Sequence, residues 1–136
     1  MRVIAGNYRG VEGPAATCSP LNVWDVRLQA GHESTFSWPE GHNAAIAVLR
    51  GEISANGSRE AKDADLVLFD RTGSEVRIAA AADSTLLLLG GALIPEPIVG
   101  YGPFVMNSRR EIETALNDLH MGKFGQLPPA HAHGGA

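Results

Sequence analysis

The sequence predicts an all-β fold, a sandwich or barrel, followed by one C-terminal α-helix. Up to Gly91, short apolar or alternating runs recur at regular spacing, and glycine-containing turns separate them. Short strands with this spacing are typical of sandwiches and barrels. Beyond a proline- and glycine-rich stretch, apolar residues return at the spacing of an amphipathic helix. They are Ile112, Ala115, Leu116 and Leu119.

The strands are predicted from alternation and from the turns that bound them. In residues 22–28, Trp24, Val26 and Leu28 share one face, which indicates a half-buried strand. Residues 86–89 are apolar on both faces, so their strand should be central and covered on both sides. The pattern also predicts strands at 3–5, 36–38, 44–49, 52–55, 66–69, 75–79 and 85–89, with a hairpin across Arg50 and Gly51.

The character of the sequence changes in its last third. Prolines and glycines between residues 94 and 104 should prevent regular structure there. Ser108 and Glu111 then form a capping box at the start of the helix, and Gly122 can end it. We expect residues 1–127 to form a single domain and residues 128–136, rich in proline and glycine, to form a flexible tail.

Length, composition and charge exclude several classes of protein. A chain of 136 residues, of which 44% are hydrophobic, fits one globular domain. Its formal charge of −4 gives no electrostatic basis for binding nucleic acid. A single cysteine rules out an internal disulfide, and no apolar run is long enough to cross a membrane. We therefore expect a soluble, cytoplasmic protein without a nucleic-acid or membrane partner.

Two stretches resemble, in their spacing, the two signatures of the cupin barrel. Residues 31–51 can be aligned with G-x5-H-x-H-x4-E-x6-G, and residues 57–72 with G-x5-P-x-G-x2-H-x3-N. In metal-bearing cupins, the His and Glu residues of these signatures bind one ion. The corresponding positions here hold Ser37, Pro39, Ala44 and Leu68. Because these side chains are poor ligands for a transition metal, the resemblance implies a cupin barrel (a jelly roll, or double-stranded β-helix) whose metal positions are vacated.

A second resemblance covers residues 2–126 and is strongest over residues 96–125, which read EPIVGYGPFVMNSRREIETALNDLHMGKFG. This run resembles the end of pirin-family proteins, which carry EPIVxYGPFVMN, a capped helix and a closing G-K/R-F-G. The family implies two cupin barrels in one polypeptide, of which the first holds iron and the second does not. Its members are described as metal-dependent oxygenases that act on flavonols such as quercetin, or as regulators that bind other proteins. The resemblance implies that this chain corresponds to the C-terminal, metal-free barrel.

The vacated metal positions favour a non-catalytic function. We expect no catalytic residue, no metal and no cofactor, and a module that acts in protein association or in binding a small apolar ligand. A barrel that normally packs against another leaves apolar surface when it stands alone. Its partner should therefore be a second copy, in a homodimer, or a metal-bearing cupin chain. The alternative is a quercetin dioxygenase component that depends on such a metal-bearing partner barrel.

The histidines offer only weak candidates for a metal site. His131 and His133 form the one H-x-H of the chain, a spacing that can bind metal when a rigid strand carries it. In a tail rich in proline and glycine, this geometry is not prearranged. His32 and His42 flank the first cupin-like stretch, and we interpret them as exposed loop residues.

Overall fold

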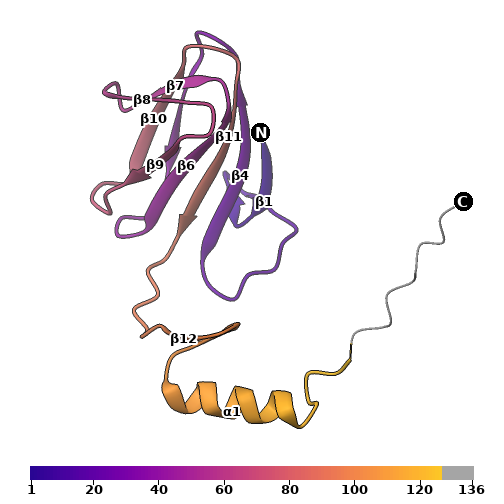
Figure 1. Ribbon diagram of the computed structural model, residues 1–136. Coiled ribbons are helices and arrows are strands. Elements are labelled where there is room, and N and C mark those ends of the chain that lie inside the picture. Colours follow the sequence, from indigo (N-terminus) through magenta and orange to yellow (C-terminus); the bar gives the residue numbers. More distant parts are fainter. Residues whose placement is uncertain (127–136) are drawn as a thin grey trace, which may run out of the picture. The chain divides into compact units, whose positions relative to one another are not determined.

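The computed structural model describes residues 1–126, and the chain divides into two compact units, Met1–Leu93 and Ile94–Ala136 (Figure 1). The single domain expected over residues 1–127 stays a prediction. The expected tail, residues 128–136 with His131 and His133, lies outside the described residues. Among residues 1–126, no helix combines the length and the apolar character that a transmembrane segment needs.

The first unit is a sandwich of two antiparallel β-sheets, which confirms the predicted all-β fold. The larger sheet contains β1 (Arg2–Ala5), β4 (Leu21–Leu28), β6 (Asn43–Arg50), β9 (Leu66–Phe69) and β11 (Ser84–Gly91), in the order β1-β4-β11-β6-β9. The smaller sheet contains β5 (Glu33–Ser37), β7 (Glu52–Ala55), β8 (Arg59–Lys62) and β10 (Glu75–Ala80), in the order β5-β10-β7-β8. A short hairpin pairs β2 (Asn7–Tyr8) with β3 (Val11–Glu12).

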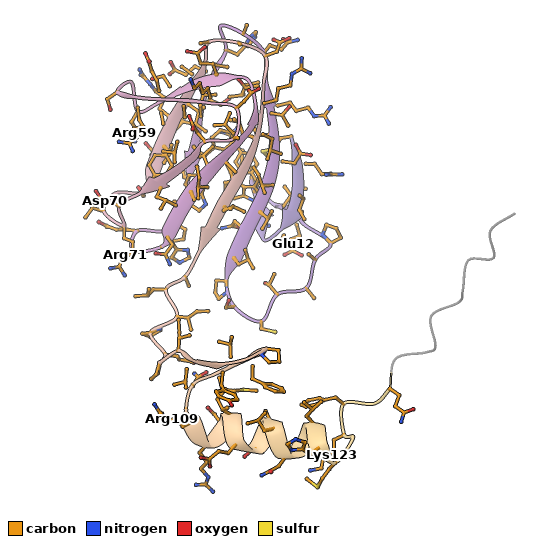
Figure 2. The ribbon with its side chains drawn as sticks, viewed as in Figure 1. Glu12, Arg59, Asp70, Arg71, Arg109 and Lys123 are labelled. Atoms are coloured by element: carbon orange, nitrogen blue, oxygen red, sulfur yellow. The ribbon has the colours of Figure 1, made fainter. Side chains whose placement is uncertain are left out.

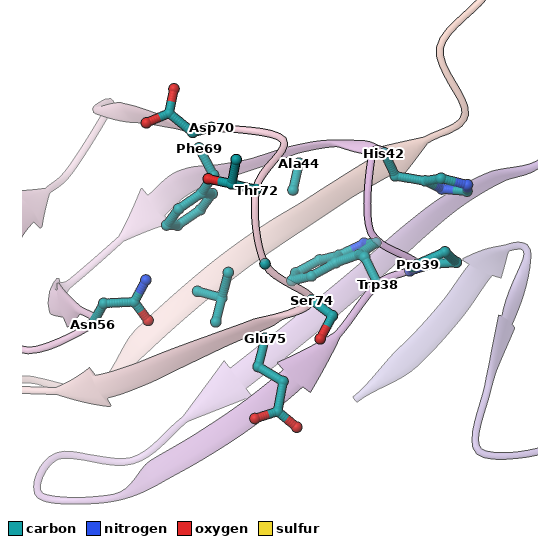
Figure 3. Close-up of a pocket in the computed structure, with 12 residues that line it drawn as sticks. Trp38, Pro39, His42, Ala44, Asn56, Phe69, Asp70, Thr72, Ser74 and Glu75 are labelled. Carbon is teal, nitrogen blue, oxygen red and sulfur yellow. The ribbon is translucent and has the colours of Figure 1, made fainter.

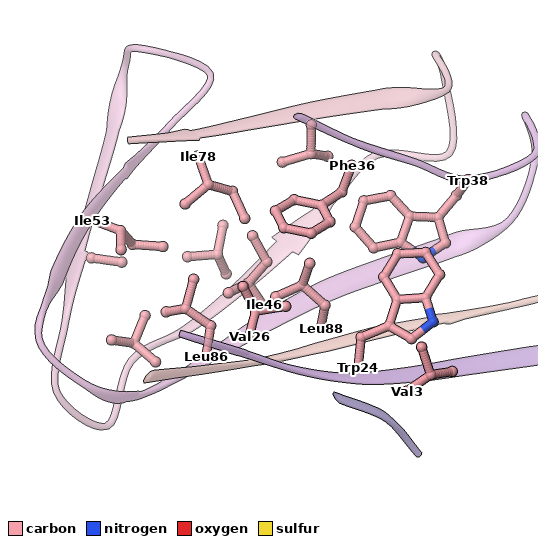
Figure 4. Close-up of a cluster of buried hydrophobic side chains, with 14 residues drawn as sticks. Val3, Trp24, Val26, Phe36, Trp38, Ile46, Ile53, Ile78, Leu86 and Leu88 are labelled. Atoms are coloured by element: carbon pink, nitrogen blue, oxygen red, sulfur yellow. The ribbon is translucent and has the colours of Figure 1, made fainter. Parts of the chain in front are cut away.

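The core lies between the two sheets, because alternate side chains of each sheet point into it. In β4, Trp24 and Val26 are each 2% exposed, as the alternation predicts. β11 is the middle strand of the larger sheet, as predicted for residues 86–89. The predicted cover on both sides is not found in the first unit, since the outward side chains Leu87 and Leu89 are only half-buried. Figure 4 shows large side chains from both sheets meeting in this layer. They include Trp24, Phe36, Trp38, Ile46, Ile53, Ile78, Leu86 and Leu88.

The hairpin predicted across Arg50 and Gly51 is wrong. β6 pairs with β11 and β9, whereas β7 pairs with β10 and β8, so the chain crosses from one sheet to the other at this point. Gly51 has a φ of +98°, and a Cβ there would overlap with Ser84. Glycine permits a crossing between sheets as readily as a hairpin turn, so the local sequence does not show which of the two forms. The short strand β8 was also not predicted.

The second unit contains a hairpin that the sequence did not predict. β12 (Val99–Tyr101) pairs with β13 (Phe104–Met106) across a turn in which Gly102 has a φ of +55°. The expectation of no regular structure up to residue 104 was therefore wrong. Glycine and proline at this place form a turn between two short strands rather than interrupt a longer element.

The helix α1 (Arg109–His120) starts where the capping box predicts. The Oγ of Ser108 accepts a hydrogen bond from the backbone N–H of Glu111 at 3.3 Å. The carboxylate of Glu111 in turn accepts one from the backbone N–H of Asn107 at 3.0 Å. α1 contacts both strands of the hairpin, and its Ile112 and Ala115 are buried.

Replacing Ser108 with alanine should loosen the start of α1, because the N–H of Glu111 loses its acceptor. Loss of an N-cap costs about 1 kcal/mol, which corresponds to about fivefold faster amide exchange in the first helical turn. Hydrogen exchange measured by NMR would detect this. Thr114→Ala is the matched control, since that hydroxyl only donates to the carbonyl of Arg110 inside the helix. Equal exchange in the two variants would contradict the role of the cap.

Candidate functional site

The first unit contains a cavity of about 250 Å³ beside its aromatic core. The cavity lies between the β5–β6 connection and the β9–β10 connection. The ends of the strands next to these connections also line it. Backbone hydrogen bonds hold the two connections together. The N–H of Gly41 donates to the carbonyl of Arg71 at 3.0 Å, and the N–H of Trp38 donates to the carbonyl of Ser74 at 2.9 Å. The walls of the cavity are therefore fixed by the backbone.

Aromatic and aliphatic side chains form the floor of the cavity. Trp38, Ala44, Phe69 and Val76 line it, and Figure 3 shows the rings of Trp38 and Phe69 on facing sides. On its far side, the indole of Trp38 stacks on that of Trp24, with ring centroids 5.3 Å apart and planes inclined by 18°. Such a pair stabilises by about 0.5–1.5 kcal/mol beyond the area that it buries.

Further rings fill the interior of the sandwich next to this stack. Tyr8 meets Trp24 edge-on, with centroids 5.0 Å apart, and its ring lies 5.9 Å from that of Phe36. Trp24 and Phe36 are themselves 6.3 Å apart. The space between the two sheets next to this stack is thus occupied by side chains.

The rim of the cavity is polar and carries negative charge. Asp70 and Glu75 are the charged residues among those that line it, and Thr72 and Ser74 contribute hydroxyl groups. His42 lies at the same rim and is half-buried, so the interpretation of it as an exposed loop residue is wrong. His32, by contrast, is exposed. The fold thus brings acidic and hydroxyl groups around an aromatic floor.

Only some of the predicted metal positions face this cavity. Pro39 and Ala44 line it, but Ser37 and Leu68 point to the outside of their strands, and Leu68 is 72% exposed. The side chains that face the cavity at these two places are their neighbours, Trp38 and Phe69. Because side chains alternate along a strand, the alignment of Ser37 and Leu68 with inward-facing ligands needs a shift of one residue.

The side chains that face the interior do not fit a transition metal. After the shift, the inward positions hold an indole, a proline ring, a methyl group and a phenyl ring, none of which donates a lone pair to a metal. Within the described residues, no group of three or more His, Cys, Asp or Glu side chains is arranged to hold an ion. No metal-dependent step can be assigned to these residues.

A second feature is the outer face of the larger sheet, which is also apolar. The register places Val23, Leu89, Ala45 and Leu68 in one row across four strands. The adjacent row contains Leu87, Ala47 and Leu66. We call these seven residues the outer face. Leu66 and Leu68 are 57% and 72% exposed, so this surface is open in the first unit.

The topology and the site define a protein of the cupin fold with one C-terminal helix. The structure matches that of quercetin 2,3-dioxygenase from Acinetobacter baumannii with a TM-score of 0.85 and 43% sequence identity. The match covers 93% of this chain and 44% of that one.

Residues 23–125 match the Pirin C-terminal cupin domain, and the chain belongs to the pirin family. It is 46% identical over 124 residues to the Pseudomonas aeruginosa protein named "Putative quercetin 2,3-dioxygenase PA2418", covering 91% of this chain and 43% of that one. It is 34% identical over 133 residues to Pirin-like protein 2 of Arabidopsis thaliana, covering 92% of this chain and 41% of that one. The chain thus spans less than half the length of these two relatives.

Sequence reasoning missed most residues of the cavity, and one signal could have found them. Residues 66–69 are apolar throughout, so their pattern does not say which side chains face inward. Trp38 and Phe69 are, however, the largest side chains in their runs, and large aromatic residues favour buried positions. Asp70 and Glu75 flank a Gly-containing turn and resemble ordinary turn residues in sequence. Their convergence on the cavity follows only from the pairing of β9 and β10 in different sheets.

Replacing Gly90 with alanine should displace Trp38, because a Cβ at this place would overlap with the indole ring. Overpacking of this kind destabilises by about 1–3 kcal/mol. Urea unfolding followed by tryptophan fluorescence would measure it. Gly91→Ala is the matched control, since the nearest atom to its Cβ would be the Pro20 carbonyl oxygen at 3.4 Å, an ordinary contact. If the two variants were equally stable, the absence of a side chain at Gly90 would not be required for the packing of the Trp38 ring.

Proposed function

We propose that this chain is a non-catalytic pirin-like cupin module that acts in protein association and in binding a small ligand. The observation that carries the association is the outer face, where seven apolar side chains are contiguous across four strands. Antiparallel sheets that face water on one side normally place polar residues there. A contiguous apolar surface of this kind is typical of a protein–protein contact. The expected cytoplasmic location stays a prediction.

The partner proposed for the outer face is another cupin sheet, supplied by a second copy of this chain or by a metal-bearing cupin chain. Packed sheets lie about 10 Å apart and interdigitate apolar side chains, as the two sheets of this sandwich already do. Leu87 and Leu89 lie on β11, the middle strand, so the centre of the outer face is apolar. Asp25 and Arg2 form an ion pair of 3.1 Å at one border, which supplies a polar rim.

Replacing Leu68 with glutamate should weaken self-association at least about tenfold, because a charge would be buried against apolar side chains. Sedimentation equilibrium over a range of protein concentrations would measure the change. Val11→Glu is the matched control, since Val11 is 60% exposed but lies on β3, away from the outer face. A wild-type protein that stays monomeric at micromolar concentration would refute the homodimer, and mixing with a metal-bearing cupin chain would then test the other partner.

The alternative function is a pirin-like quercetin dioxygenase component that needs a metal-bearing partner barrel. Relatives named as quercetin 2,3-dioxygenases support it, although each is more than twice as long as the part that matches. Since the inward side chains here do not fit a metal, oxygen uptake with quercetin should be absent with this chain alone. Stoichiometric iron together with turnover by the isolated chain would contradict the non-catalytic proposal. Turnover that appears only on mixing with a metal-bearing cupin chain would favour the alternative.

A further inference from the structure

We propose that the cavity beside Trp38 binds a small, single-ring organic cation. This inference rests on the small-ligand part of the proposed function and gives that ligand a size and a charge. The cavity is lined only by residues of the first unit, so its geometry does not depend on the second.

The size of the cavity suits a small ligand. Pockets that hold drug-sized molecules measure roughly 300–1,000 Å³. This one has about 250 Å³, and its floor is partly occupied by the rings of Trp38 and Phe69. An engineered apolar cavity of about 150 Å³ holds benzene, so a molecule with one ring and a short polar substituent fits this space.

The floor favours an aromatic or cationic group. Trp38 and Phe69 present their rings on facing sides of the cavity (Figure 3), and a ring placed between them would contact both. The face of an aromatic ring also attracts a cation within about 6 Å. Ala44 and Val76 complete the floor with aliphatic surface.

The rim favours a positive charge over a negative one. Asp70 and Glu75 are both carboxylates, and the lining contains no lysine or arginine. Arg71 is next to Asp70 in sequence, but only its neighbours line the cavity, and its carbonyl is bonded to the N–H of Gly41. Figure 3 shows the carboxylates of Asp70 and Glu75 at different edges of the cavity, both directed away from the rings. They therefore act on a ligand through their charge at the rim and not by direct contact.

Two lining residues also have polar atoms without a protein partner. The Nε1 of Trp38 and the Nδ1 of His42 are buried and make no hydrogen bond within the described residues. Buried polar groups are nearly always hydrogen-bonded in proteins. Both atoms are, however, enclosed by protein, and the Nε1 of Trp38 faces Gly90 on β11. A ligand in the cavity does not reach them, so its recognition rests on the rings and on the charge of the rim.

Three single-ring probes of similar size and different charge test this inference on the full chain. Benzylammonium should bind with a Kd on the order of 1 mM, the range for so small a ligand. Benzyl alcohol should bind about two- to fivefold more weakly, and benzoate more weakly still. The only two tryptophans of the chain form the stack behind the cavity, so their fluorescence and ligand-observed NMR both report binding.

Two sets of variants locate the site. Ala44→Leu fills the cavity and should abolish binding of benzylammonium, whereas Ala45→Leu, on the outer face, should preserve it. The double variant Asp70→Asn, Glu75→Gln should keep binding but remove the preference for benzylammonium over benzyl alcohol. The double variant Glu12→Gln, Glu60→Gln, on β3 and β8, is its charge-matched control, because it also removes two exposed carboxylates, neither of which lines the cavity. Figure 2 shows Glu12 well apart from Asp70. Asp70 and Glu75 are exposed, so the variant Asp70→Asn, Glu75→Gln stays informative even if Ala44→Leu fails to fold.

The results separate this inference from the association. Benzoate that binds as tightly as benzylammonium would overturn it, as would binding unchanged in both Ala44→Leu and the variant Asp70→Asn, Glu75→Gln. Failure of every probe to bind at about 10 mM would also overturn it. Each of these results leaves the self-association of the wild-type chain, measured by sedimentation without probe, as a separate finding.

Discussion

The stack of Trp38 on Trp24 is the constraint on which the rest of the first unit depends. The two indoles lie 5.3 Å apart between the sheets, and both are almost fully buried. The two rings fill space between the sheets that a ligand or metal site inside the sandwich would need. Because Gly90 alone leaves room for the Trp38 ring, the central strand β11 is adapted to this stack. The cavity is what remains open on the far side of Trp38.

Among residues 1–126, side chains that line the cavity also occupy the positions aligned with or next to the metal ligands of cupins. A metal site needs several inward donors around a small open volume. Here the inward positions carry Trp38, Ala44 and Phe69, which contribute apolar contacts. Burying an aromatic side chain stabilises by about 1.5–3 kcal/mol relative to leaving it exposed. These side chains thus contribute to the stability of the fold.

The sequence predicted the elements of this fold better than their connections. Alternation located β4, short apolar runs bounded by turns located β9 and β11, and the capping box located the start of α1, because these signals are local. The corner at Gly51 and the hairpin of residues 99–106 were missed, since the same glycine permits a hairpin, a corner or an irregular turn. Which of these forms is decided by pairing with strands far away in the sequence.

The assignment of vacated metal positions stays a prediction, and the sequence did not show which side chains of those segments face the cavity. The segments with cupin-like spacing border the cavity, but within them Ser37 and Leu68 face outward and their neighbours Trp38 and Phe69 line the cavity. A run such as residues 66–69, apolar at every position, suits a strand whose two faces are both to be covered. Because both faces of β9 are apolar, its sequence does not show which side chains point inward. The same apolar residues form part of the outer face.

β9 is the element in which the cavity and the outer face meet. Phe69 lines the cavity, whereas Leu66 and Leu68 belong to the outer face. In its sheet, β9 is an edge strand of four residues that pairs only with β6, so fewer hydrogen bonds hold it than hold β11. A partner that binds the outer face would therefore contact β9, the strand that positions Phe69 in the wall of the cavity. If occupancy of either site is to influence the other, a shift of β9 against β6 is the shortest physical route.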